Sequence, residues 1–121
     1  MDPLETFEAL FHRVCDERDP DGATALWADD DDVTLFGSER TDTARGPAEI
    51  REHMDAIANA GATIRFVWNE RHAHVEGEVA WVTAAGTLTI DDRASPYQAA
   101  CVLVRRDGTW RLHTFSGSEP R

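Results

Sequence analysis

His113 is the first side chain whose type and position could support a reaction. It lies near the C-terminus in an alternating segment, where Arg111 and Phe115 share its face of a predicted strand. Histidine is the usual proton shuttle near neutral pH when it faces a cleft. We therefore take His113 as a candidate acid–base catalyst, with Asp32 as the carboxylate that assists it. Alternation does not choose the face, so His113 could instead face a subunit interface or a hydrogen bond in the core.

A second pair, His72 and His74, has the His-x-His spacing that places both side chains on one face of a strand. Glu70 and Glu76 share this spacing, so a metal site with two histidines and one carboxylate is conceivable. The alternative, which we favour, is a solvated pair beside the turn at Glu76-Gly77.

The acidic run from Asp29 to Asp32 offers oxygen ligands for a hard cation. Consecutive residues do not converge easily on one ion, so we interpret the run as a solvated turn between a helix and a strand. We predict neither a metal nor another cofactor.

Other polar residues are assigned structural roles. His53 is expected to be exposed on a helix, opposite its apolar positions, and Tyr97 is expected to pack at the start of a strand, although its hydroxyl could reach a ligand. Glu39 with Arg40 or Arg45 is expected to form a surface ion pair.

Composition excludes several classes of function. The chain has 121 residues and a formal net charge of −11, and all 12 of its basic residues are arginine. An acidic chain is a poor partner for nucleic acid or for an anionic membrane surface, and the lack of lysine excludes Schiff-base and P-loop chemistry. No apolar stretch approaches the roughly 18–20 residues of a membrane span, and the N-terminus lacks the pattern of a signal peptide. We expect a cytoplasmic protein in which Cys15 and Cys101 are reduced, buried hydrophobes.

Helical patterns dominate the first half of the chain. Asp2 and Glu5 have the spacing of a capping box, and apolar residues recur at helical spacing from Leu4 to Val14. A short second helix is expected at about residues 23–28, and a third from Gly46-Pro47 to about Asn59, where Asn and Gly mark its end. A short strand is expected at residues 33–36.

The second half alternates with a period of two. Strands are predicted at residues 63–73, 79–90, 97–105 and 110–115, with Asp107-Gly108 as a hairpin turn. Helices followed by an antiparallel meander indicate one α+β domain over residues 1–121, with the N-terminal helices packed on a curved, mostly antiparallel sheet. The hollow between sheet and helices is where a small ligand would bind.

Three segments carry a family resemblance: Leu26-Trp27-Ala28-Asp29-Asp30, Val33-Thr34-Leu35-Phe36-Gly37 and Gly46-Pro47-Ala48-Glu49-Ile50-Arg51. Together with Gly77-Glu78-Val79-Ala80-Trp81 and Arg106-Asp107-Gly108-Thr109-Trp110-Arg111, they resemble the nuclear transport factor 2-like superfamily, and within it the SnoaL-like proteins and ketosteroid isomerases. The resemblance implies a cone-shaped fold and a homodimer formed through the open face of the sheet.

Ketosteroid isomerases use a tyrosine, a carboxylate base and a protonated carboxylic acid. By motif spacing, the resemblance places these groups at Phe11, near Leu35 or Phe36, and near Ala100, which are all apolar here. Chemistry by that constellation is therefore not expected, and whether the protein is an enzyme stays open.

We expect a small apolar cyclic ligand in the cone-shaped pocket. The expected lining consists of apolar and aromatic residues: Phe11, Trp27, Leu35, Phe36, Met54, Trp68, Trp81, Tyr97 and Phe115. One alternative is an isomerase, cyclase or hydrolase that uses His113 with a carboxylate. The other is a non-catalytic homodimerisation module.

Overall fold

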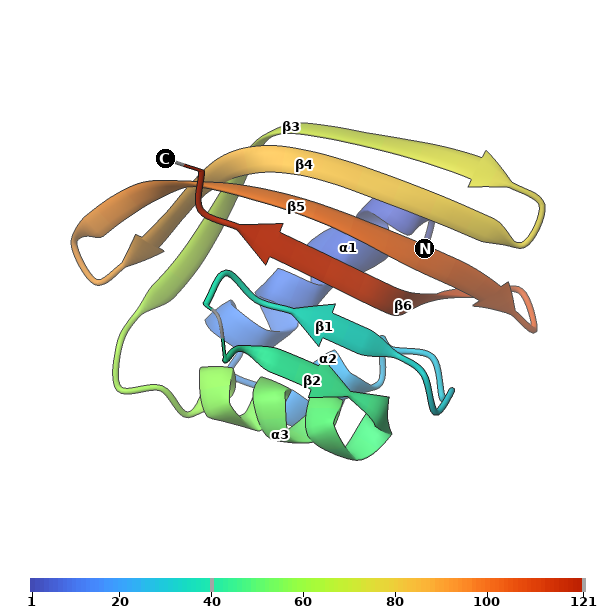
Figure 1. Ribbon diagram of the computed structural model, residues 1–121, viewed down its shortest axis with the longest axis horizontal. Coiled ribbons are helices and arrows are strands. Elements are labelled where there is room, and N and C mark those ends of the chain that lie inside the picture. Colours follow the sequence, from blue (N-terminus) through green and yellow to red (C-terminus); the bar gives the residue numbers. More distant parts are fainter. Residues whose placement is uncertain (40, 121) are drawn as a thin grey trace.

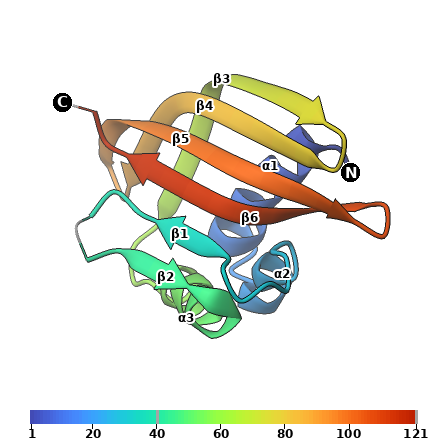
Figure 2. The ribbon, with the colours of Figure 1, turned by 45° about the vertical axis from the view of Figure 1, so that its right-hand side comes forward.

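The computed structural model describes residues 1–39 and 41–120, so Arg40 and its expected ion pair lie outside the described residues. Six strands form one curved sheet in the order β2-β1-β6-β5-β4-β3, and helices cover its inner face (Figures 1 and 2). The strands are β1 (Thr34–Phe36), β2 (Thr43–Arg45), β3 (Ile64–Glu76), β4 (Val79–Ile90), β5 (Arg93–Arg106) and β6 (Thr109–Ser118). All neighbouring strands are antiparallel except β1 and β6, which run parallel. The predicted α+β fold class is confirmed.

The first helix, α1 (Pro3–Phe11), begins where the sequence predicts, because Asp2 and Glu5 form the capping box. The backbone N–H of Glu5 donates to Asp2 Oδ1 at 2.8 Å, and that of Asp2 donates to Glu5 Oε1 at 2.9 Å. The expected helix to Val14 is interrupted, since a π-helical turn, η1 (His12–Asp16), follows α1.

The second helix is displaced from its expected position. It is α2 (Pro20–Thr24), and its N-cap is Asp19, whose side chain accepts from the Gly22 N–H at 3.0 Å. Trp27, expected in this helix, instead forms an isolated parallel bridge with Leu112 of β6. The segment Asp19-Pro20-Asp21-Gly22 therefore begins the helix.

The third helix, α3 (Gly46–Ala58), buries Ile50, Met54 and Ala58 and lies beside β1 and β2 (Figure 2). Its C-terminal connection is held by Arg18, whose guanidinium donates to the carbonyl oxygens of Ala60 at 2.8 Å and Ala62 at 3.0 Å.

The long strands bury one face against α1. Ala80, Val82 and Leu88 of β4 point inward, whereas Trp81 points outward and is 43% exposed. β3 forms one edge of the sheet and is interrupted by an irregularity between Trp68 and Glu70. None of the described helices combines the length and the apolar character that a membrane crossing requires.

Candidate functional site

A cavity of about 400 Å³ lies between the inner face of the sheet and the helices α1, η1 and α3. Its wall is mainly aliphatic and aromatic. These lining residues are Leu10, Phe11, Val14, Leu35, Met54, Ile57, Ile64, Phe66, Leu88, Ile90, Tyr97 and Phe115. The aromatic side chains pack against one another. The ring centroids of Phe11 and Phe66 are 4.7 Å apart, and those of Phe66 and Tyr97 are 5.2 Å apart. The result is an apolar wall built by side chains from both layers of the fold.

Polar side chains gather on one side of this cavity. Ser38, Glu39 and Asp42 come from the connection between β1 and β2, His53 comes from α3, and Glu119 follows β6. We call this side the polar rim. A ligand with an apolar body and one polar group would therefore place that group at the polar rim.

His53 and Asp42 are in contact at the polar rim, with 3.2 Å between His53 Nδ1 and Asp42 Oδ1. Their side chains are 18% and 34% exposed. The prediction that His53 is exposed is therefore wrong. His53 lies three residues after the buried Ile50 and four before Ile57 of the cavity wall, which places all three on one helix face. That spacing is the signal that could have identified His53; no pattern in the sequence points to Asp42.

Gly37 makes room for Asp42. A Cβ atom on Gly37 would lie 1.7 Å from Asp42 Oδ2, so the carboxylate occupies the space that any other residue would fill. The loop is closed by the Gly37 N–H, which donates to the Asp42 carbonyl at 2.7 Å. Asp42 is thus fixed by its backbone as well as by its side chain.

Tyr97 lies beside the polar rim, and its phenol fills the space above Gly117. A Cβ atom on Gly117 would be 2.0 Å from the phenol oxygen. Burial, followed by the charges of Asp42 and Glu119, raises the pKa of Tyr97 to about 12, and a hydrogen bond with Ser38 lowers it in part. Tyr97 therefore keeps its proton at neutral pH and can donate a hydrogen bond to a ligand oxygen.

The structure brings His113 and Asp32 together, but away from the cavity wall. His113 Nε2 is 3.0 Å from Asp32 Oδ1, and His113 Nδ1 is 2.8 Å from Thr114 Oγ1. The Asp32 side chain is 80% exposed, and neither residue lines the cavity. The pairing of β5 with β6 changes register here, between Val102 and Leu103, so simple alternation does not hold at His113. A catalytic role for this pair stays a prediction.

Asp30, Asp32 and His113 are the described residues whose possible metal ligands lie within 4.8 Å of one another. Both oxygens of Asp30 accept from Arg106, at 2.8 and 2.9 Å, and these hydrogen bonds hold the pKa of Asp30 below its ordinary value. Because both carboxylate oxygens of Asp30 already accept hydrogen bonds from Arg106, they are not free to bind a cation, and this cluster is a poor metal site.

His72 and His74, which the sequence predicts to be a solvated pair, are exposed on the outer face of the sheet. His74 stacks on Trp81 with 4.6 Å between ring centroids, and its Nε2 is 3.1 Å from Glu76 Oε1. Within residues 1–39 and 41–120, the two histidines do not belong to a group with metal-ligand distances.

Five of the nine residues expected to line the pocket lie on the cavity wall: Phe11, Leu35, Met54, Tyr97 and Phe115. The other four are placed elsewhere. Trp27 and Trp68 pack in the interior, where Trp68 contacts Phe7 and Phe11, while Phe36 and Trp81 point outward from β1 and β4. The large rings of Phe36 and Trp81 suggest a pocket role, but alternation along their strands points both side chains outward.

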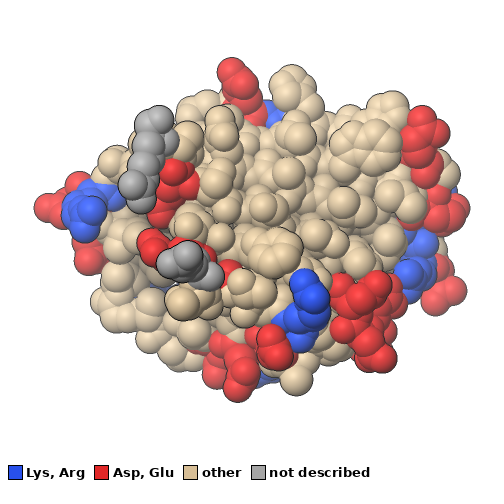
Figure 3. Space-filling model, in the orientation of Figure 1, with Lys and Arg blue, Asp and Glu red and all other residues tan. Residues whose placement is uncertain are grey.

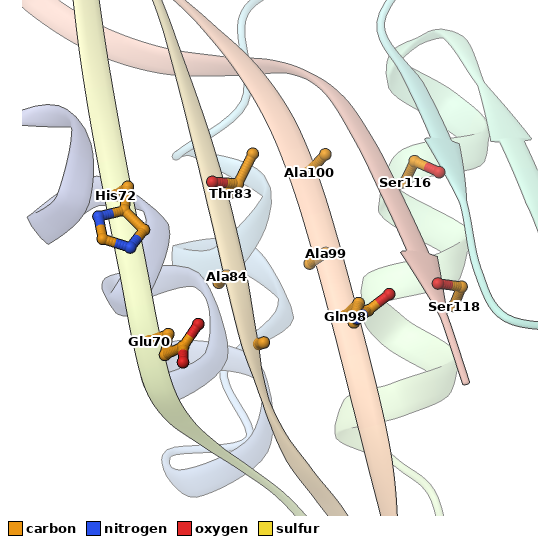
Figure 4. A pocket seen from close by; sticks show the side chains of 10 residues that line it. Glu70, His72, Thr83, Ala84, Gln98, Ala99, Ala100, Ser116 and Ser118 are labelled. Carbon is orange, nitrogen blue, oxygen red and sulfur yellow. The ribbon is translucent and has the colours of Figure 1, made fainter. Parts of the chain in front are cut away.

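The outer face of the sheet carries a second, shallower hollow of about 410 Å³ (Figure 4). Its lining is mostly small or polar and includes Glu70, His72, Gln98, Ala100, Ser116 and Ser118. The area over β3 to β6 is largely uncharged, with acidic side chains around its margin (Figure 3). Ala100, one position at which the resemblance places a catalytic acid, therefore faces this hollow rather than the inner cavity.

The SnoaL-like domain family model matches residues 4–121 of this chain. No curated protein matches it.

Solved structures share the fold at low sequence identity. A nuclear transport factor 2-like protein of unknown function from Pseudomonas putida KT2440 superposes with a TM-score of 0.82 at 20% identity, over 97% of this chain and 83% of that chain. A putative dehydratase of the nuclear transport factor 2-like family from Streptomyces avermitilis gives 0.82 at 18% identity, over 98% and 94%. A putative ketosteroid isomerase from Parabacteroides distasonis ATCC 8503 gives 0.76 at 18% identity, over 99% and 89%. At these identities the likeness shows the fold alone.

Proposed function

This chain belongs to the SnoaL-like domain family, and from that premise we propose that it binds a small, largely apolar cyclic molecule in the cavity between its helices and sheet. The ligand places its apolar body against the aromatic wall and a single polar group at the polar rim.

The observation that carries this proposal is the composition of the cavity. A volume of about 400 Å³ falls in the range of roughly 300–1,000 Å³ typical of small-molecule sites. The apolar wall would remove ligand surface from water at about 25 cal/mol per Å², whereas the polar rim fixes orientation. The outer hollow lacks the aromatic side chains that would hold such a ligand.

A thermal-shift titration tests the proposal with steroid-, polyketide- and terpene-like compounds. A ligand that binds the folded state raises the melting temperature with its concentration. Ile57→Trp introduces a large ring into the cavity from α3, and Val75→Trp introduces the same ring at a residue that is 48% exposed and outside the cavity.

We expect saturable shifts with the wild type and Val75→Trp, and their loss with Ile57→Trp. Circular dichroism of each variant checks that its fold is retained. If no compound raises the melting temperature, or if Ile57→Trp responds like the wild type, the cavity is not the binding site.

We also propose a homodimer formed through the outer face of the sheet. Phe36 and Trp81 are 41% and 43% exposed there, and the same face carries the small side chains of Ala85 and Ala100. Exposed apolar patches of this kind mark association surfaces. The exposed apolar side chains therefore favour homodimerisation as a second function. A dimer formed through the outer face would leave the inner cavity free for a ligand.

A further inference from the structure

We propose that His53 is a general base, oriented by Asp42, that removes a proton from a carbon atom of the apolar ligand. This inference rests on the proposed ligand-binding function and adds a chemical step at the polar rim. The substrate class is an uncharged apolar molecule whose C–H bond is made acidic by a neighbouring electronegative group.

The contact with Asp42 determines which nitrogen of His53 is available. The Asp42 carboxylate lies 3.2 Å from Nδ1 in an ion-pair contact, and in the proposal it stabilises a proton on Nδ1, which leaves the electron pair on Nε2. No hydrogen-bond partner of Nε2 is found among residues 1–39 and 41–120. His53 lines the cavity, and we assign Nε2 as the nitrogen that accepts the proton from a bound molecule.

Asp42 is held in place before any ligand arrives. Its N–H donates to the Glu39 carbonyl at 3.0 Å, its carbonyl accepts from Gly37 at 2.7 Å, and its side chain lies in the space left by Gly37. A base whose partner is already in position has no need to reorganise during the reaction. Asp42 is therefore a positioning residue, which also stabilises the positive imidazolium that forms.

In the proposed step, a C–H bond of the ligand breaks and an N–H bond forms at His53 Nε2. The electron pair of the broken bond moves onto the ligand's electronegative atom, where negative charge develops. The phenol of Tyr97 stays protonated and donates a hydrogen bond toward that charge. The imidazolium then returns its proton to the ligand or to water, so the step needs no oxidant or reductant.

This arrangement differs from the one that the family resemblance suggests. The positions at Phe11, Leu35 and Phe36 carry apolar side chains, and the base proposed here comes from α3 together with the connection between β1 and β2. The loss of the expected carboxylates is therefore compatible with proton-transfer chemistry in the same cavity.

The probe for the test is 5-nitrobenzisoxazole, a flat apolar molecule whose ring opens when a base removes its single acidic C–H proton. The electrons of that bond form a nitrile, the N–O bond breaks, and the oxygen leaves as a coloured phenolate that is followed by absorbance. The comparison is an equal concentration of free imidazole. Melting curves recorded with the same probe report binding separately from turnover.

We expect turnover above that of imidazole, and a fall in kcat of about 100-fold or more in His53→Asn. Asp42→Asn lowers kcat but leaves KM unchanged, since Asp42 acts through His53 rather than on the probe. The control is His12→Asn, which removes an exposed histidine of η1 and leaves the rate unchanged.

Turnover no faster than imidazole, or a His53→Asn variant as active as the wild type, overturns the proposal. Turnover lost in His113→Asn and kept in His53→Asn would assign the chemistry to the other pair. A probe that raises the melting temperature without being turned over refutes only the catalytic step. Failure of every apolar compound to bind refutes the proposed function itself.

Discussion

The substitution Gly117→Ala tests whether the phenol of Tyr97 is held by the space that Gly117 leaves. The Cβ atom of alanine would lie 2.0 Å from the phenol oxygen, 2.7 Å from Cζ and 2.9 Å from Cε1. Ordinary contacts begin near 3.4 Å, so the oxygen must move by about 1.4 Å. The backbone itself accepts alanine, because Gly117 is not among the glycines with positive φ. Any effect therefore reports on the side-chain clash.

The expected loss of stability combines three contributions. Overpacking of a filled site costs about 1–3 kcal/mol, and loss of the hydrogen bond with Ser38 costs about 1 kcal/mol. Alanine in a strand regains roughly 0.5–1 kcal/mol relative to glycine. We expect the free energy of unfolding to fall by about 1–3 kcal/mol, measured by urea denaturation.

A second measurement reads the position of the phenol directly. Tyr97 is the single tyrosine of the chain, so the phenolate absorbance reports on this residue alone. In the wild type its pKa is raised to about 12 by burial, and in Gly117→Ala the displaced phenol should titrate closer to its ordinary value of 10. Rapid pH-jump mixing records this before slow alkaline unfolding.

The sign of the pH effect follows from the same shift. Folding favours the protonated phenol, so this stabilisation is complete below pH about 10 and is lost as the pH rises through about 12.

A double-mutant cycle separates the clash from other effects. In a Tyr97→Leu background the phenol is absent, so Gly117→Ala should cost little there. Gly61→Ala is the matched control, since a Cβ on Gly61 meets no atom within 4 Å. If Gly61→Ala destabilises as much as Gly117→Ala, or if the cost of Gly117→Ala persists with Leu at position 97, the reasoning is refuted.

Three other predictions concern the rest of the molecule. Burial raises the pKa of the Cys15 and Cys101 thiols to about 12, so iodoacetamide should label the folded chain far more slowly than the urea-unfolded chain at mildly alkaline pH, and equal rates would contradict the burial. Trp81→Glu places a charge on the outer face and should convert the proposed dimer to a monomer in sedimentation velocity, whereas a monomeric wild type would refute the dimer. Asp2→Ala removes the capping box with Glu5 and should lower the free energy of unfolding, measured in urea, by about 0.5–2 kcal/mol. An unchanged free energy of unfolding would show that the cap does not stabilise the protein.

The fold could be predicted because its signals are local. The capping box at Asp2, the helical stripe of α3 and the alternation of the long strands each lie within a short stretch of sequence. The sequence does not predict β2, because Thr43–Arg45 is too short to show a period and forms a strand only by pairing with β1. The irregularity at His113 likewise depends on the neighbouring strand, which alternation along one strand does not reveal.

The candidate site was harder to predict, because its polar residues meet through tertiary structure. The prediction of an exposed His53 is wrong, because its spacing from Ile50 and Ile57 indicates the buried face of the helix. The partner of His53, Asp42, comes from a connection whose path depends on Gly37 and on the pairing of β1 with β2. The pattern of core residues predicts the apolar wall of the cavity. It does not predict the polar residues at the polar rim.

The edges of the sheet influence how copies of this protein can associate. An exposed edge strand is a template for further strands, and its growth has no natural end, as in filaments. Here one edge is β2, which has three residues, and the other is β3, which is broken beside Trp68 and carries the charged Glu70 and Arg71. Both are poor templates for aggregation. The face-to-face pairing proposed above closes after two copies, so it would produce a finite assembly rather than open-ended growth.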